Sequence, residues 1–403
     1  MTERRPVGFG RRDDTGPKPE EGSAVPAGTA KLDDEAMARL IPVRDARGHK
    51  GTFGKILVIA GSLDYAGAAL LVCRAAGRAG AGLVTLAVPE SLQPLFAAKV
   101  VEATTMPLPE DDVEEVDPEP ALAAILDHEH DAMVIGPGLR PSLATADLLR
   151  LVLTAPEETS GPPAVLDAEA LRTLASADEW WTSVTRPCVL TPHVGEFLRL
   201  RAGAGHAPDE DGDLNADDGA RARAAGAAAT EWNQVVVLKG ANTVIAAPDG
   251  SVALAPFENP AMASGGTGDV LAGTIGALLA QGLSPFDAAR LGVYLHGQAG
   301  ELVRERLGDA GLLASDLPDA VPVVRKRLAA IAERQRGGRR LGFGARDGAP
   351  PRDGEPPRDG EPPRDGERPR DGEPPRDAEP PRDGVPPRDA EPAGEPGPSG
   401  AGS

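Results

Sequence analysis

The chain has 403 residues, and its 62 acidic side chains against 42 basic ones give a formal net charge of −20. A charge of that sign repels phosphate backbones and anionic lipid, so neither nucleic acid nor a membrane surface is an expected partner. Aromatic residues make up only 3% of the chain, and aliphatic side chains must therefore build the core.

The two ends of the chain have compositions that do not support a packed core. Residues 1–30 are rich in Gly, Pro and charge and are predicted to be a disordered extension. From Arg346 onward RDGEPP recurs with a period of six, which is two turns of a polyproline II helix, and residues 337–403 are predicted to be a disordered low-complexity tail. The tail could recruit a partner, although its composition favours a solubilising extension.

Between these ends, residues 31–336 are predicted to form a single domain in which short strands alternate with longer helices. The predicted strands are 56–61, 83–88, 132–138, 164–168, 188–193 and 235–240, and the predicted helices are 66–81, 142–154, 168–176, 195–202, 216–232, 268–281 and 285–306. The strands are apolar on both sides and need helices on each face. The predicted fold class is therefore α/β, with a doubly wound, mostly parallel sheet. Ligands bind such sheets beyond the carboxyl ends of the strands, where the motifs below lie.

The two cysteines, Cys73 and Cys188, stand far apart in apolar segments and show no CxxC spacing. They are predicted to be buried free thiols. The arginines among the first twelve residues are not followed by the apolar segment of a secretory signal peptide. No apolar run in the sequence reaches the roughly 18 residues that span a bilayer. We therefore expect a cytoplasmic protein without membrane segments.

The most specific motif is GGTGD at Gly265–Asp269, directly before an apolar helical pattern. Glycines let the backbone approach a ligand, and the unpaired N–H groups at a helix start form an anion-binding site. Asp269 would repel a phosphate there, unless it accepts the proton of a hydroxyl group that attacks phosphorus. The motif predicts phosphoryl chemistry; the alternative is that Asp269 only complements the helix dipole.

A second motif, KGANT, follows the predicted strand 235–240 and contains Lys239 and Gly240. Lys239 could meet a phosphate as a point charge, and Gly240 would let backbone N–H groups join it. An ordinary β-turn with a solvated lysine explains the same residues equally well.

Other strand-end residues carry weaker signals. His193, in TPHVGE, could hydrogen-bond a substrate amide or phosphate, or be an ordinary loop histidine. Gly138 could admit a ligand close to the backbone, and Ala68 could lie beneath a flat ring, although simple packing is an equal alternative. Asp167 and Glu196 could hold Mg²⁺ through water, and no Cys/His set with metal-ligand spacing is present. The metal ligands stay open.

Together these segments resemble the ribokinase-like ADP-dependent NAD(P)H-hydrate dehydratases. The resemblance rests, in order over residues 45–306, on HKGTFGK, AGSLDYAGAALL, GAGLVTLAVPE, VIGPGL, VLDAEAL, VLTPHVGEF, VVVLKGANTVIAAPDG, NPAMASGGTGDVLAGTIGALLAQG and GVYLHGQAGE. It implies a ribokinase-like fold and a hydro-lyase. Such a lyase dehydrates (S)-NADHX and (S)-NADPHX to NADH and NADPH, releasing AMP and phosphate, and so repairs damaged nicotinamide cofactors.

The resemblance also implies functions for individual residues. Asp269 would be the catalytic base, and Gly266, Thr267 and Gly268 would line the anion hole. Residues Lys239, Gly240, Ala241, Asn242, Thr243 and Gly268 would bind the nucleotide, while Ala68, Gly138, His193 and Asp269 would contact the hydrated nicotinamide. ADP would be the phosphoryl donor, Mg²⁺ would bridge its phosphates, and the chain would assemble as a homotetramer.

The chain departs from that family in two ways. Many relatives are fused to an N-terminal epimerase domain of about 200 residues, more than the 30 to 50 residues available here, so we expect the epimerase to be a separate protein. The RDGEPP tail lies outside the pattern. The nearest alternative is a kinase of the same fold that phosphorylates a thiazole or pyrimidine alcohol in vitamin synthesis, although TPHxGE and KGANT favour the dehydratase. A non-catalytic nucleotide sensor is another alternative.

Overall fold

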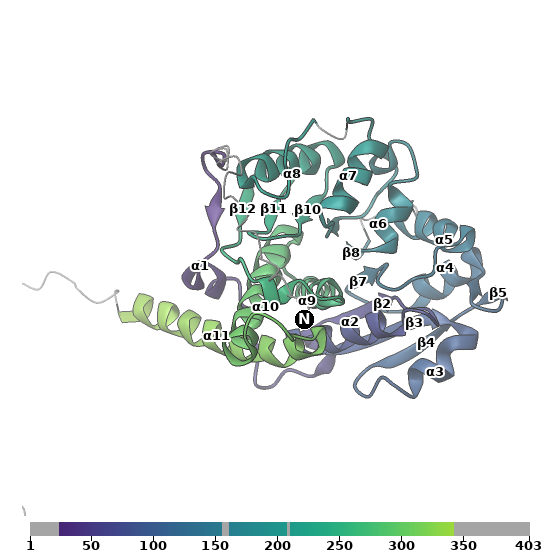
Figure 1. Ribbon diagram of the computed structural model, residues 1–403. Coiled ribbons are helices and arrows are strands. Elements are labelled where there is room, and N and C mark those ends of the chain that lie inside the picture. The colour runs from purple at the N-terminus through teal and green to yellow at the C-terminus, as the bar shows by residue number, and fades with distance from the viewer. Residues whose placement is uncertain (1–23, 155–160, 208–209, 342–403) are drawn as a thin grey trace, which may run out of the picture. The chain divides into compact units, whose positions relative to one another are not determined.

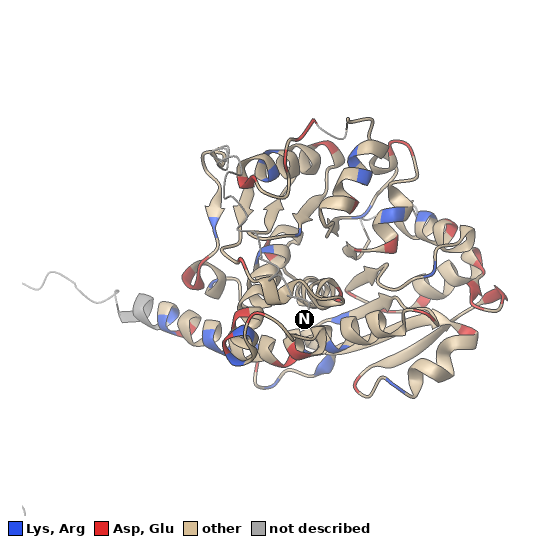
Figure 2. Ribbon diagram, viewed as in Figure 1, with Lys and Arg blue, Asp and Glu red and all other residues tan. Residues whose placement is uncertain are grey.

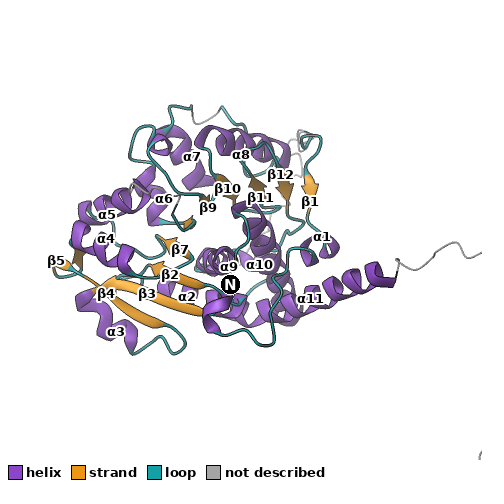
Figure 3. Ribbon diagram, turned by 180° about the vertical axis from the view of Figure 1, so that it is seen from behind, coloured by secondary structure: helices purple, strands orange, loops and turns teal. Residues whose placement is uncertain are grey.

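The computed structural model describes residues 24–154, 161–207 and 210–341, with side chains as far as residue 336. Within these residues a ten-stranded sheet has helices on both faces (Figures 1 and 3). The strand order is β1-β12-β11-β10-β9-β8-β7-β2-β3-β4. Only the β10–β11 and β11–β12 pairs of this sheet are antiparallel, so the predicted doubly wound, mostly parallel arrangement is confirmed.

The strands of the main sheet are β1 (Ala30–Lys31), β2 (Lys55–Ile59), β3 (Leu83–Pro89), β4 (Thr104–Leu108), β7 (Ala132–Ile135), β8 (Ala164–Leu166), β9 (Cys188–Leu190), β10 (Val235–Leu238), β11 (Val244–Ala246) and β12 (Val252–Leu254). A separate hairpin joins β5 (Glu110–Asp112) to β6 (Glu115–Val116). All six predicted strands are present. Five of them end two or three residues before the predicted position, because the polar motifs after them form loops rather than strand ends.

The helices are α1 (Asp34–Ala38), α2 (Ala66–Ala79), α3 (Gln93–Ala97), α4 (Pro118–Asp127), α5 (Leu143–Thr154), α6 (Glu169–Leu174), α7 (Val194–Gly203), α8 (Asp218–Trp232), α9 (Thr267–Ala280), α10 (Pro285–Leu307) and α11 (Leu317–Leu341). Short 3-10 turns lie at Lys50–Phe53, Glu90–Leu92, Trp180–Thr182, Pro260–Met262 and Ala314–Asp316. The seven predicted helices are confirmed, and α1, α3, α4 and α11 are additional.

The sheet separates two aliphatic cores. Helices α1, α2, α9, α10 and α11 cover one face, and α4 to α8 cover the other. The second core also contains the fully buried Trp232, whose ring centroid lies 5.4 Å from Trp180 and 5.9 Å from Phe197. Charged residues gather on the helices and loops and are nearly absent from the central strands (Figure 2). This is the aliphatic core that the composition predicts.

Cys73 and Cys188 are buried and unpaired, as predicted. Burial raises the pKa of both thiols to about 12, so neither forms a reactive thiolate at neutral pH. No helix in the described ranges is long and apolar enough to cross a membrane. The predicted domain limits at 31 and 336 lie one residue after the start of β1 and five before the end of α11; residues 1–23 and the RDGEPP tail lie outside the described residues.

The direction of strand addition reverses beside β2. From β2 the chain adds β3 and β4 on one side, then returns to place β7 on the other and continues through β8, β9 and β10. In open α/β sheets, the loops that leave two such strands diverge and open a crevice at their carboxyl ends. The segments after β2 and β7 contain Ala68 and Gly138, two of the predicted substrate contacts.

Candidate active site

Two helices start side by side at this edge of the sheet. A Cβ on Gly273 of α9 would lie 2.4 Å from the carbonyl oxygen of Val72 on α2, so the helices touch backbone to backbone. Gly266 directly precedes α9 in a left-handed conformation, with φ +89°. A Cβ there would lie 2.7 Å from Leu71 of α2. Glycine is therefore required at this helix start, and the positive ends of α2 and α9 lie close together.

Asp269 lies in the first turn of α9 and is mostly buried. Burial and the nearby carboxylate of Asp167 raise its pKa to about 7, and the ammonium group of Lys239 only partly opposes them. A carboxyl group with a pKa near neutrality is suited to accept a proton at physiological pH. The arrangement therefore gives Asp269 the properties of a general base.

Lys239 follows β10 and reaches beneath the start of α9. Its Nζ lies 2.7 Å from Oδ1 of the buried Asp167 and 3.8 Å from Oε2 of Glu196. Burial lowers the pKa of Lys239, but the carboxylates of Asp167, Glu196 and Asp269 outweigh it and raise that pKa above its usual value. A Cβ on Gly268 would lie 3.3 Å from Nζ, so the glycine leaves the ammonium group open toward the helix start.

His193 caps α7. Its Nδ1 accepts hydrogen bonds from the N–H groups of Gly195, at 3.0 Å, and Glu196, at 3.3 Å, while Oε2 of Glu196 accepts the N–H of His193 at 2.9 Å. This reciprocal capping box fixes the side chains. Because Nδ1 accepts, the proton of the neutral ring is on Nε2, which lies 3.5 Å from Oε1 of Glu196. His193 also pairs with Lys239 through an isolated parallel bridge, which brings it to the site.

The predicted substrate contacts Ala68 and Gly138 lie against each other. Gly138 has φ +67°, and a Cβ on it would lie 2.9 Å from Cβ of Ala68 and 2.6 Å from the carbonyl oxygen of Tyr65. Tyr65 itself, directly before α2, is 59% exposed at this crevice. No sequence motif marks Tyr65 as a functional residue.

A cavity of about 510 Å³ lies between the turn after β10 and the start of α9. Of the six predicted nucleotide-binding residues, five line it: Lys239, Gly240, Ala241, Thr243 and Gly268. Asn242 does not. Its side chain instead donates hydrogen bonds to Asp218 at 2.9 Å and Glu258 at 2.7 Å, so it holds the turn.

The same cavity is lined by His296 of α10, which the sequence analysis quoted only within a matching segment. Its Nε2 lies 2.9 Å from the carbonyl oxygen of Thr267, in the first turn of α9. Burial lowers the pKa of His296 to about 4, so the ring stays neutral and donates to that oxygen. Nδ1 then remains an acceptor. No short motif marked this residue in the sequence.

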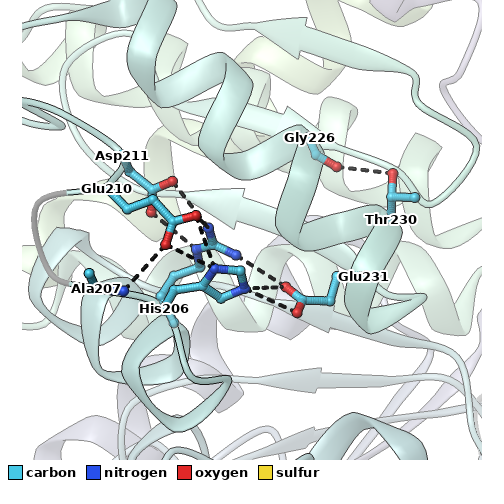
Figure 4. Close-up of polar contacts among 8 residues, drawn as sticks. His206, Ala207, Glu210, Asp211, Gly226, Thr230 and Glu231 are labelled. Carbon is cyan, nitrogen blue, oxygen red and sulfur yellow. Dashed lines mark hydrogen bonds and ion pairs between the residues drawn. The ribbon is translucent and has the colours of Figure 1, made fainter.

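Helices α7 and α8, which flank the nucleotide side of the site, are joined by a buried ion-pair cluster (Figure 4). The guanidinium of Arg201, only 4% exposed, lies 3.1 Å from both Asp211 and Glu231. His206 lies 3.1 Å from both Glu210 and Glu231. The cluster ties the end of α7 and the following loop to the end of α8, and so stabilises the arrangement of the two helices.

The acidic residues at the site do not form a metal cage. Asp167 binds Lys239, and Glu196 accepts the His193 N–H, while no group of three or more His, Cys, Asp or Glu in the described ranges is arranged to hold a metal. Mg²⁺ typically binds through one or two carboxylates together with water and phosphates. The residues present therefore fit Mg²⁺ only as an ion carried by a phosphate ligand.

Comparison with known proteins identifies the family of this chain. A family model described as NAD(P)H-hydrate dehydratase matches residues 56–323. The bifunctional NAD(P)H-hydrate repair enzyme Nnr of Moorella thermoacetica is 43% identical over 290 residues, which is 72% of this chain and 52% of that protein. The ADP-dependent (S)-NAD(P)H-hydrate dehydratase of Bacillus subtilis is 37% identical over 73% of this chain and 97% of its own length. The chain matches only about half the length of the bifunctional relatives.

Solved structures show the same fold. The ADP/ATP-dependent NAD(P)H-hydrate dehydratase of Bacillus subtilis, co-crystallised with ATP and Mg²⁺, is 34% identical with a TM-score of 0.62, over 75% of this chain and all of that one. A ribokinase-like superfamily protein of Enterococcus faecalis is 25% identical, also with a TM-score of 0.62, over 76% of this chain and 99% of its own. The predicted ribokinase-like fold is thus confirmed.

Proposed function

Because the chain belongs to the NAD(P)H-hydrate dehydratase family, we propose that it dehydrates (S)-NADHX and (S)-NADPHX to NADH and NADPH at the expense of ADP. The other products are AMP and inorganic phosphate. The reaction repairs nicotinamide cofactors that have taken up water at the ring. The proposal rests on sequence identity to an ADP-dependent dehydratase along almost its whole length and on one structural observation, the buried carboxyl group of Asp269.

Asp269 supports the proposal because of its neighbours. It shares the first turn of α9 with Gly268 and feels the charge of Lys239, both of which line the cavity, while Ala68 and Gly138 follow β2 and β7, where the sheet topology predicts a crevice. Its pKa of about 7 lets it take a proton from a hydroxyl group at neutral pH. A substrate alcohol placed in the crevice would then face a phosphate placed in the cavity.

The proposed reaction has two steps. Asp269 removes the proton of the ring hydroxyl, whose oxygen attacks the β-phosphorus of ADP, and the bond between that phosphorus and the bridging oxygen breaks to release AMP. The carbon–oxygen bond of the new phosphate ester then breaks as the lone pair of the ring nitrogen expels phosphate, and the neighbouring ring carbon loses a proton to solvent to form the carbon–carbon double bond of the reduced nicotinamide. Hydroxide is a poor leaving group, whereas phosphate is a good one, so phosphorylation makes the dehydration possible.

Other residues would position the two ligands. The N–H groups of Gly266, Thr267 and Gly268, at the positive end of α9, would form the anion hole for the transferred phosphoryl group. Lys239, which binds Asp167 and also lines the cavity, would turn from Asp167 to the phosphates. We propose that Gly240, Ala241 and Thr243 contact the nucleotide, Asn242 supports them, and His193 meets the hydrated nicotinamide through Nε2.

Mg²⁺ would enter with ADP, held by its phosphates and, through water, by Asp167 and Glu196. When bound, it would neutralise charge on the phosphates during transfer. The family resemblance further suggests a homotetramer, and light scattering on purified protein tests it.

The function is tested by mixing purified protein, Mg²⁺, ADP and (S)-NADHX and following the absorbance of reduced nicotinamide. We expect recovery that depends on ADP, with one AMP released for each NADH formed. Folded protein that restores no NADH would contradict the proposal. A stable phosphate ester formed from ATP and a thiazole or pyrimidine alcohol would instead indicate the kinase, and ADP binding without turnover would indicate a sensor.

A further inference from the structure

Arg221, on the first turns of α8, lies directly behind the turn Lys239–Thr243, which we call the nucleotide turn. Its side chain is almost fully buried, with 2% exposure. Nη2 donates a hydrogen bond to the carbonyl oxygen of Leu238 at 2.9 Å, and Nη1 donates to the carbonyl oxygen of Ala241. One guanidinium group therefore bridges the last residue of β10 and the middle of the nucleotide turn.

Gly240 fits around this guanidinium. Its φ is +153°, and a Cβ on it would lie 2.7 Å from Nη2 of Arg221, so a side chain there would displace the guanidinium from its hydrogen bonds. The sequence analysis attributed this glycine to close approach of a phosphate. The contact with Arg221 gives it a second reason: the turn can close over the guanidinium only where no side chain intervenes.

The carbonyl oxygens of Leu238 and Ala241 point toward Arg221, which leaves N–H groups of the nucleotide turn to face the cavity. Gly240 and Ala241 line that cavity. The N–H of Asn242 donates to the carbonyl oxygen of Phe257 at 2.8 Å. Among the backbone hydrogen bonds of the described loops and turns, none is donated by the N–H of Gly240 or of Ala241. Those two N–H groups are therefore free to meet an anionic ligand.

The charge of Arg221 is only loosely compensated inside the protein. Its nearest acidic atom is Oδ1 of Asp218 at 3.9 Å, and Asp218 also accepts a hydrogen bond from Asn242. Burial lowers the pKa of the guanidinium, although it stays protonated at any physiological pH. Its Nε, also buried, has no partner among the described residues. A positive charge buried in this way favours an anion on the far side of the thin turn.

We propose that Arg221 is a positioning residue for the nucleotide: it holds the nucleotide turn in the shape that binds the phosphates and adds positive charge behind them. The identity of the nucleotide as ADP rests on the proposed function. The inference concerns binding rather than chemistry, since Arg221 touches the turn and not the reacting atoms.

The test is the dissociation constant of ADP, measured by calorimetry without the hydrate, for the wild type and three variants. Arg221→Met removes both hydrogen bonds and the charge, and we expect binding at least tenfold weaker. Arg221→Lys keeps the charge but cannot reach both carbonyl oxygens, and at least a threefold loss is expected. Arg223→Gln, on the exposed side of the same helix, is the control and should bind within twofold of the wild type.

A purely structural function is distinguished by kinetics. If Arg221 positions the nucleotide, Arg221→Met raises KM for ADP at least tenfold, while KM for the hydrate and kcat at saturating ADP stay within about twofold. Wild-type affinity for ADP in the folded Met variant overturns the inference, and so does an equal rise of both KM values.

If Arg221→Met does not fold, Gly240→Ala makes the same test, because its Cβ pushes the turn and the guanidinium apart while Arg221 remains. At least tenfold weaker ADP binding is expected, and unchanged binding would refute the inference. The proposed function fails separately: wild-type protein would then bind ADP but restore no NADH from the hydrate.

Discussion

The pH dependence of the reaction is predicted to respond to a residue that touches neither ligand. Asp167 is buried, raises the pKa of Asp269 and binds Lys239 at 2.7 Å. Replacing Asp167 with Asn removes a negative charge and frees the ammonium group. Both changes favour ionised Asp269, so the pKa of the base must fall.

The size of the effect follows from the site. Moving the pKa of Asp269 from 3.8 to about 7 costs the ionised form about 4 kcal/mol. Burial is the largest cause and remains in the variant, while a like charge in the same site contributes roughly one to three units. Since Lys239 already offsets part of the Asp167 charge, we expect the pKa to fall by about one unit. At pH 6 the ionised fraction would then rise from roughly a tenth to roughly a half.

The assay measures kcat/KM for the hydrate from pH 5 to 9 at saturating ADP. The fall of kcat/KM on the acid side of this profile, its acid limb, reports the pKa of the essential base before the hydrate binds. We expect the limb near pH 7 in the wild type and about one unit lower in Asp167→Asn, even if the maximum falls. Asp178→Asn, an exposed carboxylate beyond α6, is the matched control and should leave the limb unchanged. A limb that stays in place, or moves to higher pH in the Asp167 variant, would refute the assignment of Asp269 as base.

Three further predictions concern the substrate crevice, the ion-pair cluster and the core. Gly138→Ala places a Cβ 2.6 Å from the carbonyl oxygen of Tyr65, and we expect KM for the hydrate to rise at least tenfold in steady-state assays while calorimetry shows unchanged ADP binding. Arg201→Leu removes the buried guanidinium that pairs with Asp211 and with the partly exposed Glu231, while His206 still pairs with Glu231 (Figure 4), so urea unfolding should show a loss of about 1.5–3 kcal/mol. A loss below about 1 kcal/mol would mean that the cluster does not fasten α7 to α8. Trp232→Ala removes a fully buried side chain, and the free energy of unfolding should fall by about 3–5 kcal/mol, whereas an unchanged urea midpoint would contradict that packing.

The fold was predictable where buried strands alternate with helices. That alternation is readable over most of the domain, whereas β11 and β12 follow β10 through short turns with no helix between them, so they look like parts of a loop. In α11, residues Leu317, Val321, Val324, Leu328 and Ala332 are buried at helical spacing. That pattern was readable too, but Pro322 and the surrounding charges obscured it.

The site was predictable where its residues follow strands. The carboxyl ends of parallel strands meet at one edge, so motifs after β2, β7, β9 and β10 were expected to converge, and the structure brings their residues together. Arg221 and His296 could not be found in this way. Each lies on a helix, and nothing local in the sequence says that Arg221 meets Gly240 or that His296 meets Thr267.

The fate of a single oxygen atom tests the central claim most directly. NADHX prepared in ¹⁸O-labelled water carries the label in its ring hydroxyl, and mass spectrometry can follow it through one turnover with unlabelled ADP. If Asp269 makes that hydroxyl attack phosphorus, each inorganic phosphate released contains one ¹⁸O, and Asp269→Asn forms almost no labelled phosphate although it still binds ADP. Label released as water, with unlabelled phosphate, would show that the hydroxyl group leaves without ever being phosphorylated.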